Sequence, residues 1–241
     1  MQILPDIYLM SGFAFRIHQN VYGIDVPEEK KLFLVDCGLG EEDLEQIRLS
    51  QRLWKLEDRR IEAVFVTHSH FDHGGNAAAY EAAGSRIYAG EDGESLLSGD
   101  EHTIDFAYGR PFPVCREVHK LEDGERIMLG AGYELRCHHT PGHTPGSVCY
   151  ELNHKGIKSI FTGDFIQAGE FGDDVRLGVK VDIGYSYKDY LDSMRKMMKI
   201  EADAVLPGHF HPWITGGGRI FQLAYRELLV NRERYESMSL C

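Results

Sequence analysis

Short apolar runs separated by turn residues dominate the first third of the chain. Four runs, at 7–10, 13–18, 21–26 and 31–35, are rich in β-branched and aromatic residues and are separated by Gly, Asn or Pro-Glu-Glu turns. This pattern predicts β-strands. Between residues 41 and 60 the apolar positions change to helical spacing. A second helix is predicted over the alanine-rich segment 76–83, followed by a strand at 85–89.

The rest of the chain mixes both periodicities. Residues 90–116 are interpreted as an excursion that contains helix, and residues 167–184 as a loop. The expected strands lie at 126–129, 133–137, 147–152 and 158–161, and the expected helices at 188–200 and 219–236. No composition break suggests a linker, so we expect one domain over residues 1–241. Regular βαβ alternation is lacking, and two packed mixed β-sheets with helices on the outside satisfy the layering rule best.

The N-terminal sequence, the hydrophobicity and the cysteines indicate the expected cellular location. The N-terminus, MQILPDIYLM, lacks the basic flank of a signal peptide, and no apolar stretch approaches the roughly 20 residues of a membrane span. The five cysteines form no CxxC pair, which favours free thiols over a disulfide framework. We therefore expect a soluble cytoplasmic protein, and the sequence is compatible with a homo-oligomer.

The net charge of −12 bears on the partner. Nucleic-acid binding depends on the neutralisation of phosphates by Lys and Arg, so this charge argues against a nucleic-acid partner. A small-molecule substrate is expected instead.

Residues 67–76, THSHFDHGGN, are the strongest candidate for chemistry. They bring His68, His70, Asp72 and His73 together directly after an apolar run at 61–66. Imidazole and carboxylate are preferred ligands of borderline divalent metals. Residues two apart in an extended segment point to the same side, so His68 and His70 can share one metal while the next two ligands face another. The motif predicts a metal site.

Four short apolar strands are each followed by a loop rich in Gly, Pro and polar ligands. They are 63–66 before the opening motif, 133–137 before HHTPGH, 159–161 before Thr162-Gly163-Asp164, and 204–206 before Pro207-Gly208-His209. Rigid strands that deliver ligands from adjacent ends build a preorganised site. Any one of these loops is weak support for a site, and all four in this order are strong support.

With these motifs the chain resembles the metallo-β-lactamase superfamily of hydrolases. The matching segments are LVDCG at 34–38, THSHFDHGG at 67–75, TPGHTPGS at 140–147, TGD at 162–164 and PGH at 207–209. The resemblance implies a four-layer αβ/βα sandwich with a dinuclear site at one edge. It further implies that His68, His70 and His143 hold one metal, that Asp72, His73 and His209 hold the other, and that Asp164 bridges both. Asp36 matches the family's supporting acid, which steadies the ligand histidines.

Five histidines and two aspartates make a ligand set suited to two divalent ions roughly 3.5 Å apart. Zinc is the default metal for such a set, and iron or manganese fits the same geometry. A water between the ions would ionise near neutral pH, and the bridging hydroxide would be the nucleophile. Asp72 could accept a hydrogen bond from it and shuttle its proton, so Asp72 and Asp164 are the predicted catalytic residues.

Differences between this sequence and the motifs of individual superfamily branches limit the reactions that we expect. β-Lactamases of this fold usually lack the bridging aspartate, so Asp164 argues against antibiotic hydrolysis as the main activity. Only 32 residues follow His209, too few for the glutathione-binding helical domain of glyoxalase II-like thioesterases, and Gln167 stands where lactonases often place a Tyr. The main hypothesis is hydrolysis of a small ester, lactone or thioester. The alternatives are a small-phosphodiester hydrolase and a mononuclear-iron oxidoreductase resembling persulfide dioxygenases.

The substrate pocket is expected on the loops around the metal site. Its candidate wall residues are Phe171, Tyr185, Tyr187 and Trp213, which could equally pack their own loops. His138, His139 and His211 flank the ligand motifs and are interpreted as non-ligands.

Overall fold

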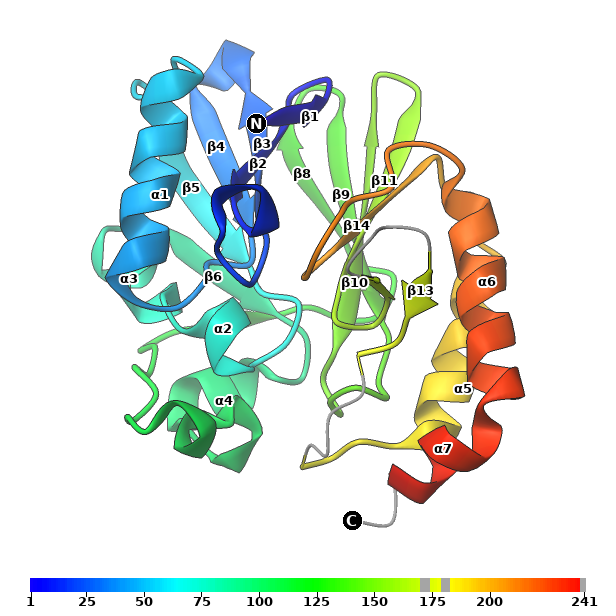
Figure 1. The fold of residues 1–241 in the computed structure, drawn as a ribbon. Coiled ribbons are helices and arrows are strands. Elements are labelled where there is room, and N and C mark those ends of the chain that lie inside the picture. The colour runs from blue at the N-terminus through cyan, green and yellow to red at the C-terminus, as the bar shows by residue number, and fades with distance from the viewer. Residues whose placement is uncertain (170–173, 179–182, 239–241) are drawn as a thin grey trace.

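The computed structural model describes residues 1–169, 174–178 and 183–238. Two β-sheets face each other at the centre of the molecule, and helices cover their outer faces (Figure 1). The seven-stranded sheet has the order β1-β2-β3-β4-β5-β6-β7. Its strands are β1 (Gln2–Leu4), β2 (Ile7–Ser11), β3 (Val21–Val26), β4 (Lys31–Val35), β5 (Arg60–Phe65), β6 (Arg86–Ala89) and β7 (His119–Lys120).

The five-stranded sheet has the order β14-β11-β10-β9-β8. Its strands are β8 (Arg126–Gly130), β9 (Tyr133–His139), β10 (Val148–His154), β11 (Ile157–Gly163) and β14 (Ala204–Pro207). Both sheets are mixed, because β4 to β7 run parallel in the first and β11 and β14 run parallel in the second, while the other neighbours are antiparallel. The short strands β12 (Gln167–Ala168) and β13 (Val175–Arg176) pair with each other.

The helices form the two outer layers. Beside the seven-stranded sheet lie α1 (Gly40–Leu53), α2 (Phe71–Gly74), α3 (Ala77–Ala82) and α4 (Gly93–Ser98), and beside the five-stranded sheet lie α5 (Tyr187–Met197), α6 (Gly217–Val230) and α7 (Arg232–Ser237) (Figure 1). Short 3-10 turns occur at Phe13–Phe15, Pro27–Glu29, Glu101–Thr103 and Asp105–Tyr108. Among the described residues, no helix is long and apolar enough to cross a membrane.

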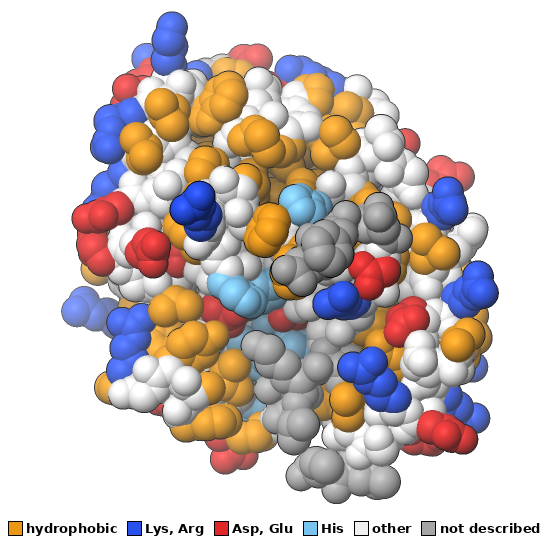
Figure 2. All heavy atoms as spheres, in the orientation of Figure 1, with side chains coloured by type: hydrophobic (Ala, Val, Ile, Leu, Met, Phe, Trp, Pro, Cys, Tyr) orange, Lys and Arg blue, Asp and Glu red, His pale blue; other side chains and the backbone are white. Residues whose placement is uncertain are grey.

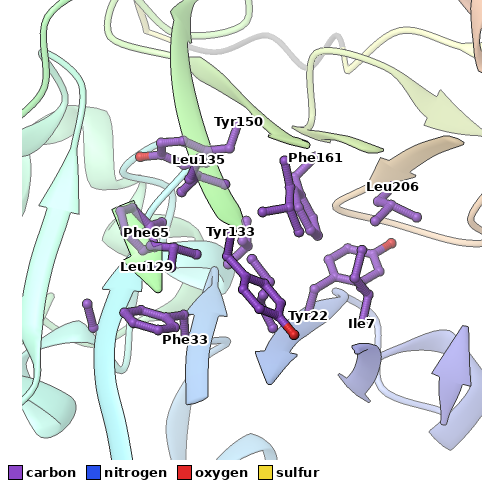
Figure 3. Packing of buried hydrophobic residues seen from close by; sticks show 14 of the residues in the cluster. Ile7, Tyr22, Phe33, Phe65, Leu129, Tyr133, Leu135, Tyr150, Phe161 and Leu206 are labelled. Carbon is purple, nitrogen blue, oxygen red and sulfur yellow. The ribbon is translucent and has the colours of Figure 1, made fainter. Parts of the chain in front are cut away.

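Alternation along the strands produces a core in three layers. In β4, Phe33 and Val35 face the five-stranded sheet, whereas Leu32 and Leu34 face the outer helices, as a period of two requires. Figure 3 shows the central layer, in which large side chains from both sheets interlock between the ribbons. A third cluster fills the space between the five-stranded sheet and α5 and α6. The predicted four-layer αβ/βα sandwich is therefore confirmed.

Four expected elements differ clearly from the structure. The segment 167–184, expected as a loop, contains the short paired strands β12 and β13. Residues 13–18 are not a strand, since Phe13–Phe15 is a 3-10 turn and Arg16 has a φ of 64°. The helix expected to reach residue 60 ends at Leu53, because Lys55 adopts a φ of 56° and the chain turns to bury Leu56. The helix expected at 219–236 is divided at Asn231, whose φ of −102° and ψ of 29° leave the helical region and whose side chain donates to the Glu227 carboxylate.

Candidate metal centre

Seven side chains from five segments meet where strand ends of the two sheets come together. His68 and His70 follow β5, Asp72 and His73 lie in α2, His143 follows β9, Asp164 follows β11 and His209 follows β14. All seven are buried, with at most 5% of their surface exposed. Figure 2 shows histidine and acidic side chains near the middle of this face. The four strand-and-loop units predicted from the sequence therefore do converge.

The first group is made of three histidines. Nε2 of His143 lies 3.2 Å from Nε2 of His68 and 3.1 Å from Nδ1 of His70. One ring nitrogen of each residue thus points to a common centre. The three nitrogens lie close enough together to hold one metal ion.

The second group contains one carboxylate and two histidines. Nε2 of His73 lies 3.2 Å from Nε2 of His209. Oδ2 of Asp72 lies 3.4 Å from Nε2 of His209 and 3.8 Å from Nε2 of His73. These three atoms form a second set that could hold a metal ion.

Asp164 lies between the two groups. Its Oδ1 is 3.3 Å from Nε2 of His73 and 3.4 Å from Nε2 of His209, whereas its Oδ2 is 3.8 Å from Nε2 of His143. Oδ1 is buried and has no hydrogen-bond partner within the described ranges. A buried carboxylate oxygen without a donor is costly, and a cation at this position would satisfy it.

Hydrogen bonds on the far side of each ring determine where the imidazole protons lie. Nδ1 of His73 donates to Oδ2 of Asp36 at 2.9 Å, Nδ1 of His143 to the carbonyl of Gly178 at 2.7 Å, and Nδ1 of His209 to the carbonyl of His18 at 3.0 Å. Carbonyl and carboxylate oxygens only accept, so each neutral ring carries its proton on Nδ1. Each Nε2 is left as a lone pair that points into the centre.

His68 is oriented through a hydroxyl group. The Thr67 hydroxyl donates to Asp36, and its oxygen lies 3.1 Å from Nδ1 of His68, from which it accepts a hydrogen bond. The Nε2 lone pairs of His68 and His143 therefore face each other, as do those of His73 and His209, each pair at 3.2 Å. Facing acceptors in a buried site need a proton or a cation between them, so this donor set fits metal ions.

Burial and neighbouring charges shift the pKa values of the two groups in different directions. Burial, assisted by neighbouring histidines, holds the pKa values of His68 and His70 well below the ordinary value, which favours the neutral form of both rings. Burial opposes the charge on His209, but Asp164 and Asp72 outweigh it and raise the pKa of His209 to about 9. Burial likewise opposes the charge on Asp164, yet His209 and His73 hold its pKa well below the ordinary value. The two carboxylates therefore favour the protonated form of His209, the opposite of the trend at His68 and His70.

Comparison with known proteins identifies the family. Residues 15–209 match the metallo-beta-lactamase superfamily. The chain belongs to this superfamily. It is 30% identical over 215 residues to the acyl-coenzyme A thioesterase MBLAC2 of Gallus gallus, which covers 79% of this chain and 72% of the relative. It is 32% identical over 167 residues to a probable polyketide biosynthesis zinc-dependent hydrolase, BaeB of Bacillus velezensis, covering 67% of this chain and 62% of that one.

Solved structures of the superfamily share the fold. The subclass B3 metallo-β-lactamase BJP-1 of Bradyrhizobium japonicum superposes with a TM-score of 0.74 at 21% identity, covering 100% of this chain and 96% of that one. A B3 metallo-β-lactamase with an active-site glutamic acid gives a TM-score of 0.75 at 24% identity, covering 96% of this chain and 89% of that one. Superfamily membership, the hydrolase relatives and the His/Asp clusters together support a metal-dependent hydrolase.

Glycine explains one of the superfamily motifs in this chain. A Cβ on Gly208 would lie 2.5 Å from Cε1 of His73 and 2.8 Å from Oδ1 of Asp164. No side chain fits at this position, because backbone and ligands approach too closely. The Pro-Gly-His order thus places His209 while leaving space for two other members of the centre.

Several supporting residues were not singled out from the sequence. Thr67 links Asp36 to His68, and its place directly before the histidine motif was the available signal. His18 lies against His209, with its Nδ1 3.2 Å from Nδ1 of that ligand, and residues 13–18 had been interpreted as a strand. Asp92 binds two ligand loops and carries no motif of its own.

The described residues among the predicted pocket residues pack in or against a hydrophobic cluster. Tyr185 and Tyr187 lie in the cluster between the five-stranded sheet and α5, and Trp213 packs against the same cluster. Phe171 lies outside the described residues. Packing gives the three described side chains a structural role, and their contact with substrate stays a prediction.

The neighbouring histidines have other partners. His138 pairs with Glu151 at 2.7 Å, and Nε2 of His139 lies 2.7 Å from the carbonyl of Leu121. The His211 ring lies 4.8 Å from the ring of Phe13, centroid to centroid.

Proposed function

We propose that this chain is a dinuclear metal-dependent hydrolase of small acyl thioesters, with esters and lactones as related substrates. The observation that carries the proposal is the pair of facing imidazole lone pairs, His68 with His143 and His73 with His209, with Asp164 between them. Such an arrangement would suit two divalent cations, with the carboxylate of Asp164 available to either.

In this proposal the seven side chains divide between two metals as the family resemblance implies. His68, His70 and His143 would hold one metal, and Asp72, His73 and His209 the other, with Asp164 contacting both. Zn²⁺ is the proposed metal because the donors are all imidazole and carboxylate and one relative is named a zinc-dependent hydrolase. Bound divalent ions supply an activated water near neutral pH and polarise the scissile carbonyl.

The protein's own groups then handle the proton. Asp72 is buried and its Oδ2 lies 3.4 Å from Nε2 of His209. Burial opposes its charge, but His73 and His209 hold the pKa of Asp72 below the ordinary value, so it is a carboxylate throughout the neutral range. Asp72 accepts a hydrogen bond from the attacking water and passes its proton to the departing sulfur. Water and thioester thus yield a carboxylic acid and a thiol.

A group of aromatic rings beside His209 also favours an organic acyl substrate. We call this group the aromatic edge; its members are Phe13, His18, Phe210 and His211. Phe13 is 38% exposed, and its ring lies 5.8 Å from that of Phe210 and 4.8 Å from that of His211. The His18 ring is 5.1 Å from the ring of His209. We propose that this edge contacts the acyl part of the substrate, since planar apolar faces suit hydrocarbon.

A substrate panel tests the proposal. The full chain, loaded with Zn²⁺, is assayed with short and long acyl-coenzyme A thioesters, a nitrophenyl ester, a lactone and a nitrophenyl phosphodiester. We expect thioester turnover that is lost in His143→Ala and Asp164→Ala, with less bound metal than in the unsubstituted chain. Glu94→Ala is the matched control, because Glu94 is an exposed residue of α4 that pairs with Lys120.

Other outcomes would replace the proposal. Phosphodiester turnover without thioester turnover would favour the phosphodiesterase alternative. One iron per chain together with oxygen-dependent oxidation of a persulfide would favour the oxidoreductase. Full thioesterase activity in metal-free His143→Ala would end the metallohydrolase reading.

A further inference from the structure

A buried carboxylate outside the seven ligands joins the two loops of the three-histidine group. Asp92 is 5% exposed and stands at the start of α4. Its Oδ2 accepts hydrogen bonds from the backbone N–H of Ser69 at 3.0 Å, from the Ser69 hydroxyl at 3.3 Å and from the Thr144 hydroxyl at 2.7 Å. Ser69 stands between His68 and His70, and Thr144 directly follows His143. One oxygen atom therefore spans both loops.

We infer that Asp92 is a positioning residue that sets metal affinity at the group His68, His70 and His143. The inference rests on the proposed function, because it assigns that group a metal. A charged acceptor shared by both loops fixes the distance between them, and such charge-assisted hydrogen bonds are stronger than neutral ones. A metal ligand set must be held within about 0.5 Å to bind well.

His70 makes this anchoring necessary. The other four ligand histidines each have an acceptor on the far side of the ring. His70 points Nδ1 into the group, and its Nε2 is buried without a hydrogen-bond partner in the part of the chain that is described. Its ring orientation therefore depends on the backbone that carries it. Asp92 holds that backbone through the N–H of Ser69.

The surroundings of Asp92 are arranged for this contact. A residue that begins a helix normally uses its side chain to accept from the first helical N–H groups, but Asp92 makes no such hydrogen bond. Its carboxylate is directed to the ligand loops instead. The loop after His143 approaches so closely that a Cβ on Gly146 would lie 2.1 Å from the Asp92 nitrogen and 2.2 Å from its Oδ1.

The effect is selective for one group of ligands. Asp36 already supports the second group through His73, and it reaches the first only through Thr67 and His68. The two residues that Asp92 contacts, Ser69 and Thr144, are adjacent in the sequence to candidate ligands of the first group only. Loss of Asp92 should therefore weaken one metal site and leave the other unchanged.

Two single variants allow metal binding to be measured at one group at a time. His209→Ala leaves the three-histidine group intact, and His143→Ala leaves Asp72, His73 and His209 intact. Zn²⁺ affinity of the full chain is measured by competition with a chromophoric chelator. Adding Asp92→Ala should weaken Zn²⁺ binding about 10- to 100-fold in the His209→Ala background and leave it unchanged in the His143→Ala background. Asp92→Asn keeps an acceptor oxygen and should recover part of the loss, and Glu94→Ala should change neither affinity.

The outcomes separate this inference from the proposed function. Unchanged affinity in the His209→Ala background, or equal weakening in both backgrounds, would overturn the role of Asp92 while leaving the metallohydrolase in place. No Zn²⁺ binding by the wild-type chain would overturn the proposed function itself. If Asp92→Ala does not fold by circular dichroism, Ser69→Ala with Thr144→Val removes the two hydroxyl donors to Asp92 and keeps the backbone donor, although it also removes the contacts of these hydroxyls with His102 and Ser147. That pair must reproduce the selective loss for the inference to stand.

Discussion

Oδ2 of Asp36 lies 2.9 Å from Nδ1 of His73 and fixes which nitrogen of that ring faces the metal centre. The same carboxylate accepts from the backbone N–H and the hydroxyl of Thr67. Asp36 holds these contacts with a φ of 59°, a conformation that Asp and Asn tolerate better than most residues.

Replacing Asp36 should lower metal affinity without unfolding the protein. Asp36→Asn keeps the tolerated backbone conformation but removes the charge that orients His73. We expect metal affinity to fall about 10- to 100-fold with the fold retained. Metal content after dialysis against graded chelator, together with circular dichroism, measures both. Wild-type metal retention in Asp36→Asn would contradict the supporting role.

Gly208→Ala should damage the centre by steric contact alone. The added methyl group would lie 2.5 Å from His73, so the ligands must separate or the backbone must shift. We expect metal binding and turnover to be lost together. Gly218→Ala in α6 is the matched control, since the nearest atom to its Cβ would lie 3.9 Å away. The control should keep full activity and gain up to about 1 kcal/mol of stability from helix propensity.

Phe161 tests the layer between the sheets. It is fully buried, and its ring lies 5.4 Å from that of Tyr22 on the opposing sheet (Figure 3). Phe161→Ala should lower the free energy of unfolding by about 3–5 kcal/mol, measured by urea denaturation. Phe106→Ala, at a position 67% exposed, should change it by less than about 0.5 kcal/mol. Similar losses for both variants would mean that the two sheets do not share this core.

The metal-free protein should lose stability as the solution becomes alkaline. Because the folded pKa of His209 is raised to about 9, its ion pairs with Asp164 and Asp72 contribute fully below its unfolded value of about 6.5. That contribution disappears as pH rises from about 6.5 through 9. Urea denaturation of chelator-treated protein across this range measures the decline. His209→Ala should flatten the profile, and an equally steep decline in that variant would assign it to other groups.

The pattern of apolar runs and turn residues was sufficient to predict the strands whose ends carry the candidate site. Strands at 21–26 and 31–35 have their predicted bounds, since apolar runs bounded by turn residues define both ends. The segment 13–18 was predicted wrongly because its apolar and polar residues resemble a strand, whereas its conformation depends on contacts with His209 and Phe210. Long-range contacts of this kind leave no periodicity in the sequence.

Asp92 illustrates the same limit for the site. The candidate ligands were predicted because their motifs follow strands closely, but Asp92 acts through Ser69 and Thr144, which are distant from it along the chain. An aspartate at the start of a short helix is ordinarily interpreted as a cap. Only the packing of three loops reveals its other role.

The contact between His209 and the carbonyl of His18, 191 positions apart, also bears on biosynthesis. Asn20 strengthens the same connection by donating to the carbonyls of Pro207 and Phe210. Residues near the N-terminus leave the ribosome first, yet they gain these partners only after strand β14 has been translated. A nascent chain therefore contains His68, His70 and His143 before His209 of the second group has been translated.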